Sequence, residues 1–233
     1  MLSARPRRIA VLCSGRAPGL LHLLPRSDAA REWRIACCLT SEDRFEFEDD
    51  VARSGVPIIH HAIHRYYAEH ASDARLSDRN VRQAFDAETV KLLDGYQPDL
   101  VILAGYLWLL TQPMLTRFEN RIINVHHADL LLRSASGAVR YPGLRAVRDA
   151  ILAGERETRC TAHLVTDRLD EGPILARSAP FPVPEIAAWA RSHGEHDVLR
   201  RVIWAHQEWM LRAAFGPLME RAIETLAQRE RAA

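Results

Sequence analysis

The chain has 233 residues, enough to bury one sizeable core, and its 48% hydrophobic and 26% charged residues are ordinary for a globular protein. A formal net charge of +1 gives no general attraction to nucleic acid or anionic lipid, so neither nucleic acid nor a membrane is an expected partner. No apolar run approaches the ~20 residues of a membrane span. The four cysteines lie in apolar stretches without metal-ligand spacing, which predicts a cytoplasmic protein with reduced thiols and no bound metal.

Apolar runs separated by charged segments make up the first part of the chain. Residues 9–13, 33–39 and 56–59 predict three buried strands, because each is a short continuous apolar stretch. The charged segment 45–54 predicts a short helix that ends at a glycine. The three histidines within 60–64 have no nearby Cys, Asp or Glu at metal-ligand spacing, which favours a solvated loop.

The middle of the chain continues the alternation of strands and helices. Residues 77–80 can cap an amphipathic helix that reaches Gly95, and the apolar run 100–104 predicts the next strand. Pro113 can begin a short helix, and residues 122–126 predict a further strand. This alternation predicts an α/β fold with a doubly wound, mostly parallel sheet, in which ligands bind beyond the carboxyl ends of the strands.

The remaining elements complete one predicted catalytic domain. They are a helix and two strands, at 144–152, 161–165 and 174–181. Prolines at 182 and 184 mark a boundary, after which residues 183–228 are expected to form a helical closure that includes a pair of packing helices from 197 to 228. We expect a single domain over residues 1–233, with its core at 8–182.

Two polar side chains share one face at the end of the strand 122–126. Because strand side chains alternate between faces, Asn124 and His126 point the same way and His127 points to the other face. An amide can hold a developing oxyanion, an imidazole can move a proton near neutral pH, and a carboxylate such as Asp170 would fix the imidazole tautomer. The pattern predicts attack on a carbonyl carbon. A polar strand end bonded to nearby backbone is the alternative.

Four motifs, in one order and at similar spacing, resemble the folate-dependent formyltransferase superfamily, whose type member is phosphoribosylglycinamide formyltransferase. They are Leu103-Ala104-Gly105-Tyr106, Asn124-Val125-His126, Tyr141-Pro142-Gly143-Leu144 and the loop 165–173. The resemblance covers about residues 8 to 182. It implies a Rossmann-like catalytic domain that takes 10-formyltetrahydrofolate as formyl donor, a small-molecule amine as acceptor and no metal.

The resemblance also implies the roles of particular residues. Asn124, His126 and Asp170 match the family's catalytic asparagine, histidine and aspartate, which transfer the formyl group without a covalent enzyme intermediate. A turn aspartate is the alternative for Asp170. Backbone groups of two loops would hold the pteridine ring of the folate. The folate-contacting residues implied are Leu103, Gly105, Tyr106, Leu107, Leu109, Val165, Thr166 and Asp167.

The acceptor side departs from the family pattern. Ser14, Gly15 and Arg16 occupy the place of a phosphate loop, but the second glycine and the Ser-Asn pair of that loop are absent. Pro18 also removes a backbone N–H that a phosphate would use, so a plain strand-to-helix turn is the favoured alternative. Glu208 lies where family members place an acceptor-contacting glutamate. The identity of the acceptor therefore stays open.

An insertion follows the catalytic strand. Residues 127–140 form a longer connection than in the transformylases, and the small residues of 134–138 predict a mobile loop tip. Arg140, with Arg133, can bind an anionic group of the acceptor in place of the phosphate loop. A surface insertion without a role is the alternative.

Two further functions compete with formyl transfer. His127 directly after His126, and the segment 161–163 with its histidine His163, also resemble formyltetrahydrofolate deformylases. A deformylase would here lack the regulatory domain that precedes the catalytic domain in that family. A catalytically silent folate-binding homologue is the third reading. We favour transfer to an amine, and a homodimer is compatible with the sequence.

Overall fold

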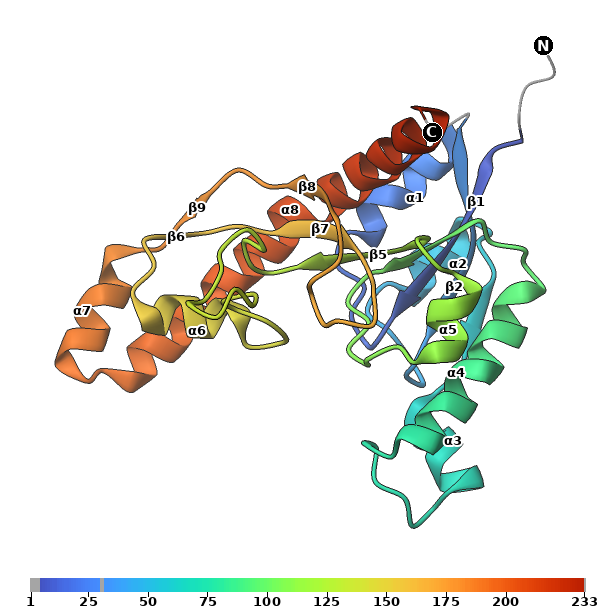
Figure 1. Ribbon diagram of the computed structural model, residues 1–233, viewed down its shortest axis with the longest axis horizontal. Helices are drawn as coiled ribbons and strands as arrows, with labels where there is room; N and C mark the ends of the chain where they lie inside the picture. Colours follow the sequence, from blue (N-terminus) through green and yellow to red (C-terminus); the bar gives the residue numbers. More distant parts are fainter. Residues whose placement is uncertain (1–4, 30–31, 233) are drawn as a thin grey trace. The chain divides into compact units, whose positions relative to one another are not determined.

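The computed structural model describes residues 5–29 and 32–232. The chain divides into two compact units, Met1–Ile123 and Asn124–Ala233, and each is described by itself. The central sheet has seven strands in the order β3-β2-β1-β4-β5-β7-β8 and is flanked by helices (Figure 1). Its mostly parallel pairing and C-terminal helices confirm the predicted fold class.

Unit 1 holds four strands of the sheet that pair in parallel. Its elements are β1 (Arg7–Cys13), α1 (Leu20–Ala29), β2 (Trp33–Thr40), α2 (Glu48–Arg53), β3 (Ile58–His60), α3 (Ile63–His70), α4 (Arg79–Asp94), β4 (Leu100–Leu103) and α5 (Gln112–Arg117). β1 pairs in parallel with both β2 and β4, and β2 pairs in parallel with β3. Asp78 caps α4 as predicted, because its carboxylate accepts from the N–H groups of Asn80 and Val81.

The predicted solvated loop at 60–64 is wrong in part: His60 and His64 are exposed, but the segment contains the end of β3 and the start of α3. His61 is buried, its ring stacks on that of Phe85 with 4.0 Å between centroids, and Ile63 begins α3. Burial lowers the pKa of His61, so the neutral ring behaves as an aromatic core residue. His61 concealed the inward packing of this segment, because a neutral imidazole can pack like an apolar ring.

Unit 2 begins within β5 and ends with the C-terminal helices. Its elements are β5 (Ile122–His126), α6 (Ala146–Ala153), β6 (Glu157–Thr158), β7 (Thr161–Leu164), β8 (Ile174–Arg177), β9 (Phe181–Pro182), α7 (Glu185–His193) and α8 (His196–Ala232). The predicted single strand 174–181 is two strands. β8 pairs antiparallel with β7, whereas β9 pairs antiparallel with β6 in a separate two-stranded sheet.

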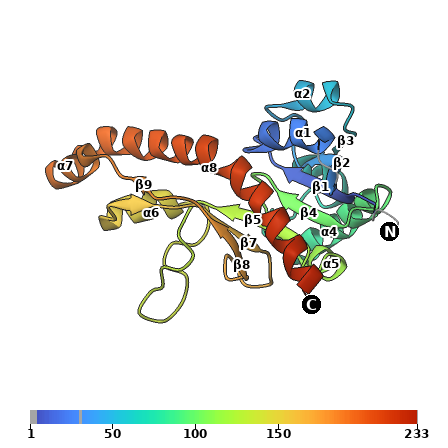
Figure 2. The same cartoon turned by 90° about the horizontal axis from the view of Figure 1, so that it is seen from above.

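The C-terminal helix is one element, and the predicted helix pair within it is wrong. α8 runs for 37 residues, and Figure 2 shows that it bends partway along its length. Pro217 lies inside α8, and a proline removes a helical hydrogen bond and bends the axis without ending the helix. Within residues 5–29 and 32–232, no helix has an apolar stretch long enough to cross a bilayer.

Candidate active site

β5 delivers an amide and an imidazole to the same face of unit 2. Asn124 is half-buried, and His126 is 6% exposed. His126 donates through Nε2 to the carbonyl oxygen of Tyr141 at 2.8 Å, because a carbonyl can only accept. That bond fixes the ring and turns Nδ1 toward Asp170, whose Oδ2 lies 3.6 Å away. The imidazole is thus held at one nitrogen, and a carboxylate faces the other.

A strained turn places the carboxylate. Asp170 is buried, with φ of 57°, a left-handed conformation that aspartate tolerates better than most side chains. Its Oδ2 accepts from the backbone N–H of Gly143 at 2.8 Å. Gly172 permits the turn, because a Cβ there would lie 1.7 Å from the carbonyl oxygen of Leu164. Tight closure of the loop onto β7 therefore sets the position of Asp170.

His163 joins this cluster from β7. It is 2% exposed and donates through Nδ1 to the carbonyl oxygen of Leu164 at 2.9 Å. Its Nε2 accepts from the amide of Asn124 at 3.2 Å and lies 3.7 Å from Oδ1 of Asp170. Burial lowers the pKa of His163, which favours the neutral ring that these bonds require. The sequence signal was its place in the 161–163 segment, which left its role open.

His127 lies outside this cluster. Its ring packs against that of Phe215 on α8, with 4.6 Å between centroids. The alternation of β5 therefore separates the two neighbouring histidines as the sequence predicted.

The insertion has a packed base. Thr161 accepts from Leu130 N–H at 3.2 Å and donates to the carbonyl oxygen of Ala128 at 2.7 Å. Asp129 forms an ion pair with Arg177 of β8. These buried contacts mean that the start of the 127–140 segment is part of the fold of unit 2.

The tip of the insertion is an exposed turn. Arg133 and Val139 form an isolated bridge, and Ser134 N–H donates to the carbonyl oxygen of Ala138 at 2.9 Å. Arg140 lies 3.4 Å from a carboxylate oxygen of Glu155, and its guanidinium lies over the ring of Tyr141 at 5.3 Å. The predicted role of Arg140 in acceptor binding remains a prediction.

A hollow of about 410 Å³ lies between the tip and the Asp170 loop. It is lined by Ala138, Val139, Pro142, Arg168, Leu169 and Glu171. Arg168 and Glu171 are an ion pair at 3.7 Å and are the charged groups among these residues. Leu169 and Glu171 flank Asp170 in the chain, so the hollow lies against the loop that carries Asp170.

The predicted folate residues occupy two loops. In unit 1, Leu103 ends β4 and Gly105 follows with φ of 74°, where a Cβ would lie 2.7 Å from Pro18 Cδ. Tyr106 is buried, while Leu107 and Leu109 are 53% and 67% exposed. In unit 2, the predicted folate residues are Val165, Thr166 and Asp167, which follow β7. Val165 and Thr166 are half-buried, and Asp167 is exposed.

The predicted acceptor residues have partners within the protein. Ser14 is 4% exposed, with its hydroxyl 2.6 Å from that of Ser41. Arg16 lies 3.4 Å from Glu46, and Glu208 lies 3.5 Å from Arg212 on α8. These contacts leave the predicted binding roles of Ser14, Gly15, Arg16 and Glu208 as predictions.

Comparison with known proteins identifies the relatives of the chain. Residues 7–212 match the family Formyl_trans_N, described as formyl transferase. Over 121 residues the chain is 33% identical to phosphoribosylglycinamide formyltransferase of Escherichia coli (strain K12), covering 52% of this chain and 50% of that protein. Over 94 residues it is 39% identical to the formyltetrahydrofolate deformylase of the same strain, covering 40% of this chain and 31% of that protein.

A solved structure supports the same relationship. The crystal structure of glycinamide ribonucleotide transformylase 1 from Symbiobacterium toebii matches with a TM-score of 0.65 and 32% identity, covering 87% of this chain and 83% of that one. The matched parts span half or less of the length of the two Escherichia coli relatives. Activity and substrates of those proteins are therefore transferred to this chain only as proposals.

Proposed function

We propose that this chain, which belongs to the formyl transferase family, transfers a formyl group from 10-formyltetrahydrofolate to a small-molecule amine. The observation that carries the proposal is the cluster of the half-buried Asn124 with the buried His126 and Asp170. It joins an oxyanion-binding amide, a fixed imidazole and a carboxylate within one unit. Direct acyl transfer to an amine needs these three groups.

The proposed reaction needs no covalent bond to the enzyme. The amine nitrogen attacks the formyl carbon, a C–N bond forms, and the carbonyl oxygen becomes an oxyanion that an N–H of Asn124 stabilises. The intermediate collapses when the bond between the formyl carbon and the folate nitrogen breaks. The proton lost by the amine passes to that leaving nitrogen, so that the products are a formamide and tetrahydrofolate.

His126 and Asp170 support the proton movement in this proposal. The Nε2–H of His126 is held by a backbone carbonyl, so the exchangeable proton of the imidazolium lies on Nδ1. The 3.6 Å from Nδ1 to Asp170 is longer than a direct hydrogen bond, so in this proposal Asp170 orients His126 by its charge.

The acceptor is the least determined part of the proposal. The 410 Å³ hollow beside Asp170 offers apolar walls together with a cationic and an anionic side chain. These features favour an amine of modest size with polar substituents. The departures around Ser14 and Pro18 argue against assuming a phosphoribosyl group.

Turnover assays with the donor test the function. Purified protein is incubated with 10-formyltetrahydrofolate alone and then with candidate amines, including glycinamide ribonucleotide and its dephosphorylated form. Amine-dependent formation of tetrahydrofolate and the formylated amine supports transfer. Binding of the donor without turnover under any condition would identify a silent homologue and overturn the proposal.

Hydrolysis of the same donor is the second candidate. The 39% identity to a deformylase over 94 residues favours it, as does the adjacent pair His126-His127. In that reaction water replaces the amine, and formate leaves in place of the formamide. Stoichiometric formate release in the absence of any amine would establish the deformylase and exclude transfer as the main activity.

A further inference from the structure

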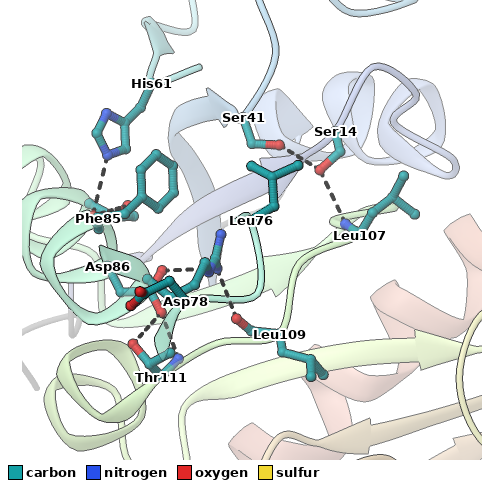
Figure 3. Close-up of polar contacts among 12 residues, drawn as sticks. Ser14, Ser41, His61, Leu76, Asp78, Phe85, Asp86, Leu107, Leu109 and Thr111 are labelled. Atoms are coloured by element: carbon teal, nitrogen blue, oxygen red, sulfur yellow. Dashed lines mark hydrogen bonds and ion pairs between the residues drawn. The ribbon is translucent and has the colours of Figure 1, made fainter. Parts of the chain in front are cut away.

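The loop at residues 105–111, which joins β4 to α5, is tied at one end to the end of β1. The Oγ of Ser14 accepts from the backbone N–H of Leu107 at 3.1 Å, and Ser14 N–H donates to the carbonyl oxygen of Gly105 at 3.2 Å. The Ser14 hydroxyl is itself held by Ser41 at 2.6 Å (Figure 3). Because Ser14 is buried, its hydroxyl can serve the loop more directly than it can serve a solvent-borne phosphate.

The other end of the loop is tied to α4. Asp86 is fully buried, and its Oδ2 accepts from both the N–H and the hydroxyl of Thr111, at 2.6 and 2.7 Å. Its partner Arg82 lies 3.4 Å away and donates to the carbonyl oxygen of Leu109 at 2.8 Å. Figure 3 shows Asp86 and Thr111 drawn together beside the Leu109 contact.

These ties hold the loop in a conformation that its own side chains do not favour. Leu107 and Leu109 are 53% and 67% exposed, although burial of either side chain would be favourable. Each of these leucines has one backbone group bonded to a buried polar side chain. The bonds therefore hold two apolar side chains outward, on a loop that is ready to receive a ligand.

We propose that Ser14 and Asp86 are positioning residues that hold the 105–111 loop in the shape that binds the folate. This inference rests on the proposed function, because the ligand of the loop is the reduced folate. A loop that is already ordered loses less entropy when the ligand binds, so its anchors raise affinity. The anchors take no part in the proposed chemical step, so kcat at saturating folate should not need them.

Two substitutions test the anchors without breaking the buried ion pair. Ser14→Ala removes the acceptor of the Leu107 N–H, and Thr111→Val removes one of the two bonds to Asp86. Ser27→Ala and Thr116→Val are the matched controls. Ser27 is buried and accepts from the backbone N–H of Ile35, and Thr116 bonds to Gln112 at the surface; neither hydroxyl bonds to the 105–111 loop among the contacts described. Removal of Asp86 or Arg82 is avoided, because an uncompensated buried charge can unfold a protein.

Binding of 5-formyltetrahydrofolate, measured by calorimetry, is the first measurement. We expect Ser14→Ala to raise Kd by roughly 5- to 10-fold, the effect of one lost hydrogen bond, with kcat at saturating donor within about twofold of wild type. Thr111→Val should act in the same direction, and both controls should bind as wild type does. Unchanged Kd in Ser14→Ala, or an equal loss in Ser27→Ala, overturns the inference. So does a rise in acceptor KM without a change in folate Kd.

Amide hydrogen exchange of the free protein separates this inference from the proposed function. The Leu107 amide should exchange faster in Ser14→Ala than in wild type or Ser27→Ala, whatever the ligand proves to be. If wild type fails to bind the reduced folate, the proposed function fails, while faster exchange still supports the anchor. Unaltered exchange at Leu107 overturns the anchor even when folate binds.

Discussion

Asn124 donates an amide hydrogen to His163, with 3.2 Å between Nδ2 and Nε2. The same imidazole donates through Nδ1 to Leu164 at 2.9 Å, so both bonds can form only when the ring is neutral. Burial lowers the pKa of His163 and favours that state. The bond fixes which end of the Asn124 amide is nitrogen, and it leaves a second N–H for an oxyanion. His163 thereby positions Asn124.

His163→Phe should lower kcat by about tenfold or more, because Asn124 loses the acceptor that orients its amide. The phenyl ring fills the buried space, so the thermal midpoint should fall by only a few degrees. Donor KM should change little. Steady-state kinetics with both substrates varied, beside a melting curve, make the comparison. Full kcat in a folded His163→Phe protein would show that Asn124 needs no such partner.

Asn124→Ala and His126→Ala should each lower kcat by ~10²-fold or more while leaving donor affinity nearly unchanged. His127→Ala is the control on the opposite strand face. It removes the contact with Phe215 and should cost stability more than turnover. Equal losses of kcat in His126→Ala and His127→Ala would contradict the assignment of faces.

Asp170→Asn should impair the chemical step and preserve the fold. Asparagine also tolerates the positive φ of this position and can still accept from the Gly143 N–H. It cannot supply the negative charge that faces His126 at 3.6 Å, so kcat should fall by ~10²-fold. Circular dichroism and kcat are measured on the same sample. Wild-type turnover would reduce Asp170 to a turn residue.

Local sequence rules predicted part of this site. Strand alternation was enough to place Asn124 with His126 and to place His127 elsewhere, and the order of motifs suggested Asp170. The bond between Ser14 and Leu107 was not predictable, because it joins a strand end to a loop 93 positions away. No periodicity of either segment encodes that pairing.

Other elements were mispredicted for physical reasons. Residues 174–181 have a continuous strand-like composition, yet the strand ends where β8 no longer has a partner in β7, and Phe181 pairs instead with β6. Residues 197–228 were expected to form a pair of helices, but α8 continues through Pro217 as one helix, because a proline can bend a helix without ending it. For residues 174–181, the pairing partners rather than the local sequence decided the structure.

Stability should decrease as pH falls below neutrality. His206 is 3% exposed, and burial lowers its pKa from 6.5, as it does for His61 and His163. A lowered folded-state pKa means that the unfolded chain takes up the proton first. Each neutral histidine makes its full contribution to the free energy of unfolding above pH 6.5. That contribution decreases as the pH falls below 6.5, by up to about 1.4 kcal/mol per pH unit.

His206→Gln should therefore lose less stability between pH 7 and pH 5 than wild type does. Glutamine can still bond to Thr158, which lies 2.7 Å from Nε2 of His206, but it does not titrate. His196→Gln, at an exposed position, controls for the loss of a histidine as such. Urea unfolding at several pH values gives the free energies. An unchanged slope in His206→Gln would mean that His206 is not among the histidines that titrate on unfolding.

Shortening the tip of the insertion, residues 134–138, should raise the KM of the acceptor amine and leave folate affinity unchanged. The deletion spares the packed base at Ala128 and Leu130 but removes Ala138 from the wall of the hollow beside Asp170. Arg140→Ala should act in the same direction for an anionic acceptor, since it removes a cation from that side of unit 2.

Arg148→Ala is the matched control for the insertion variants, because it removes an exposed arginine that pairs with Asp149 on α6. Initial rates over a range of acceptor concentrations separate KM from kcat, and calorimetry gives the folate Kd. If both insertion variants use every active amine as wild type does, the insertion does not select the acceptor. Specificity would then have to come from the side chains of Arg168, Leu169 and Glu171 on the opposite wall of the hollow.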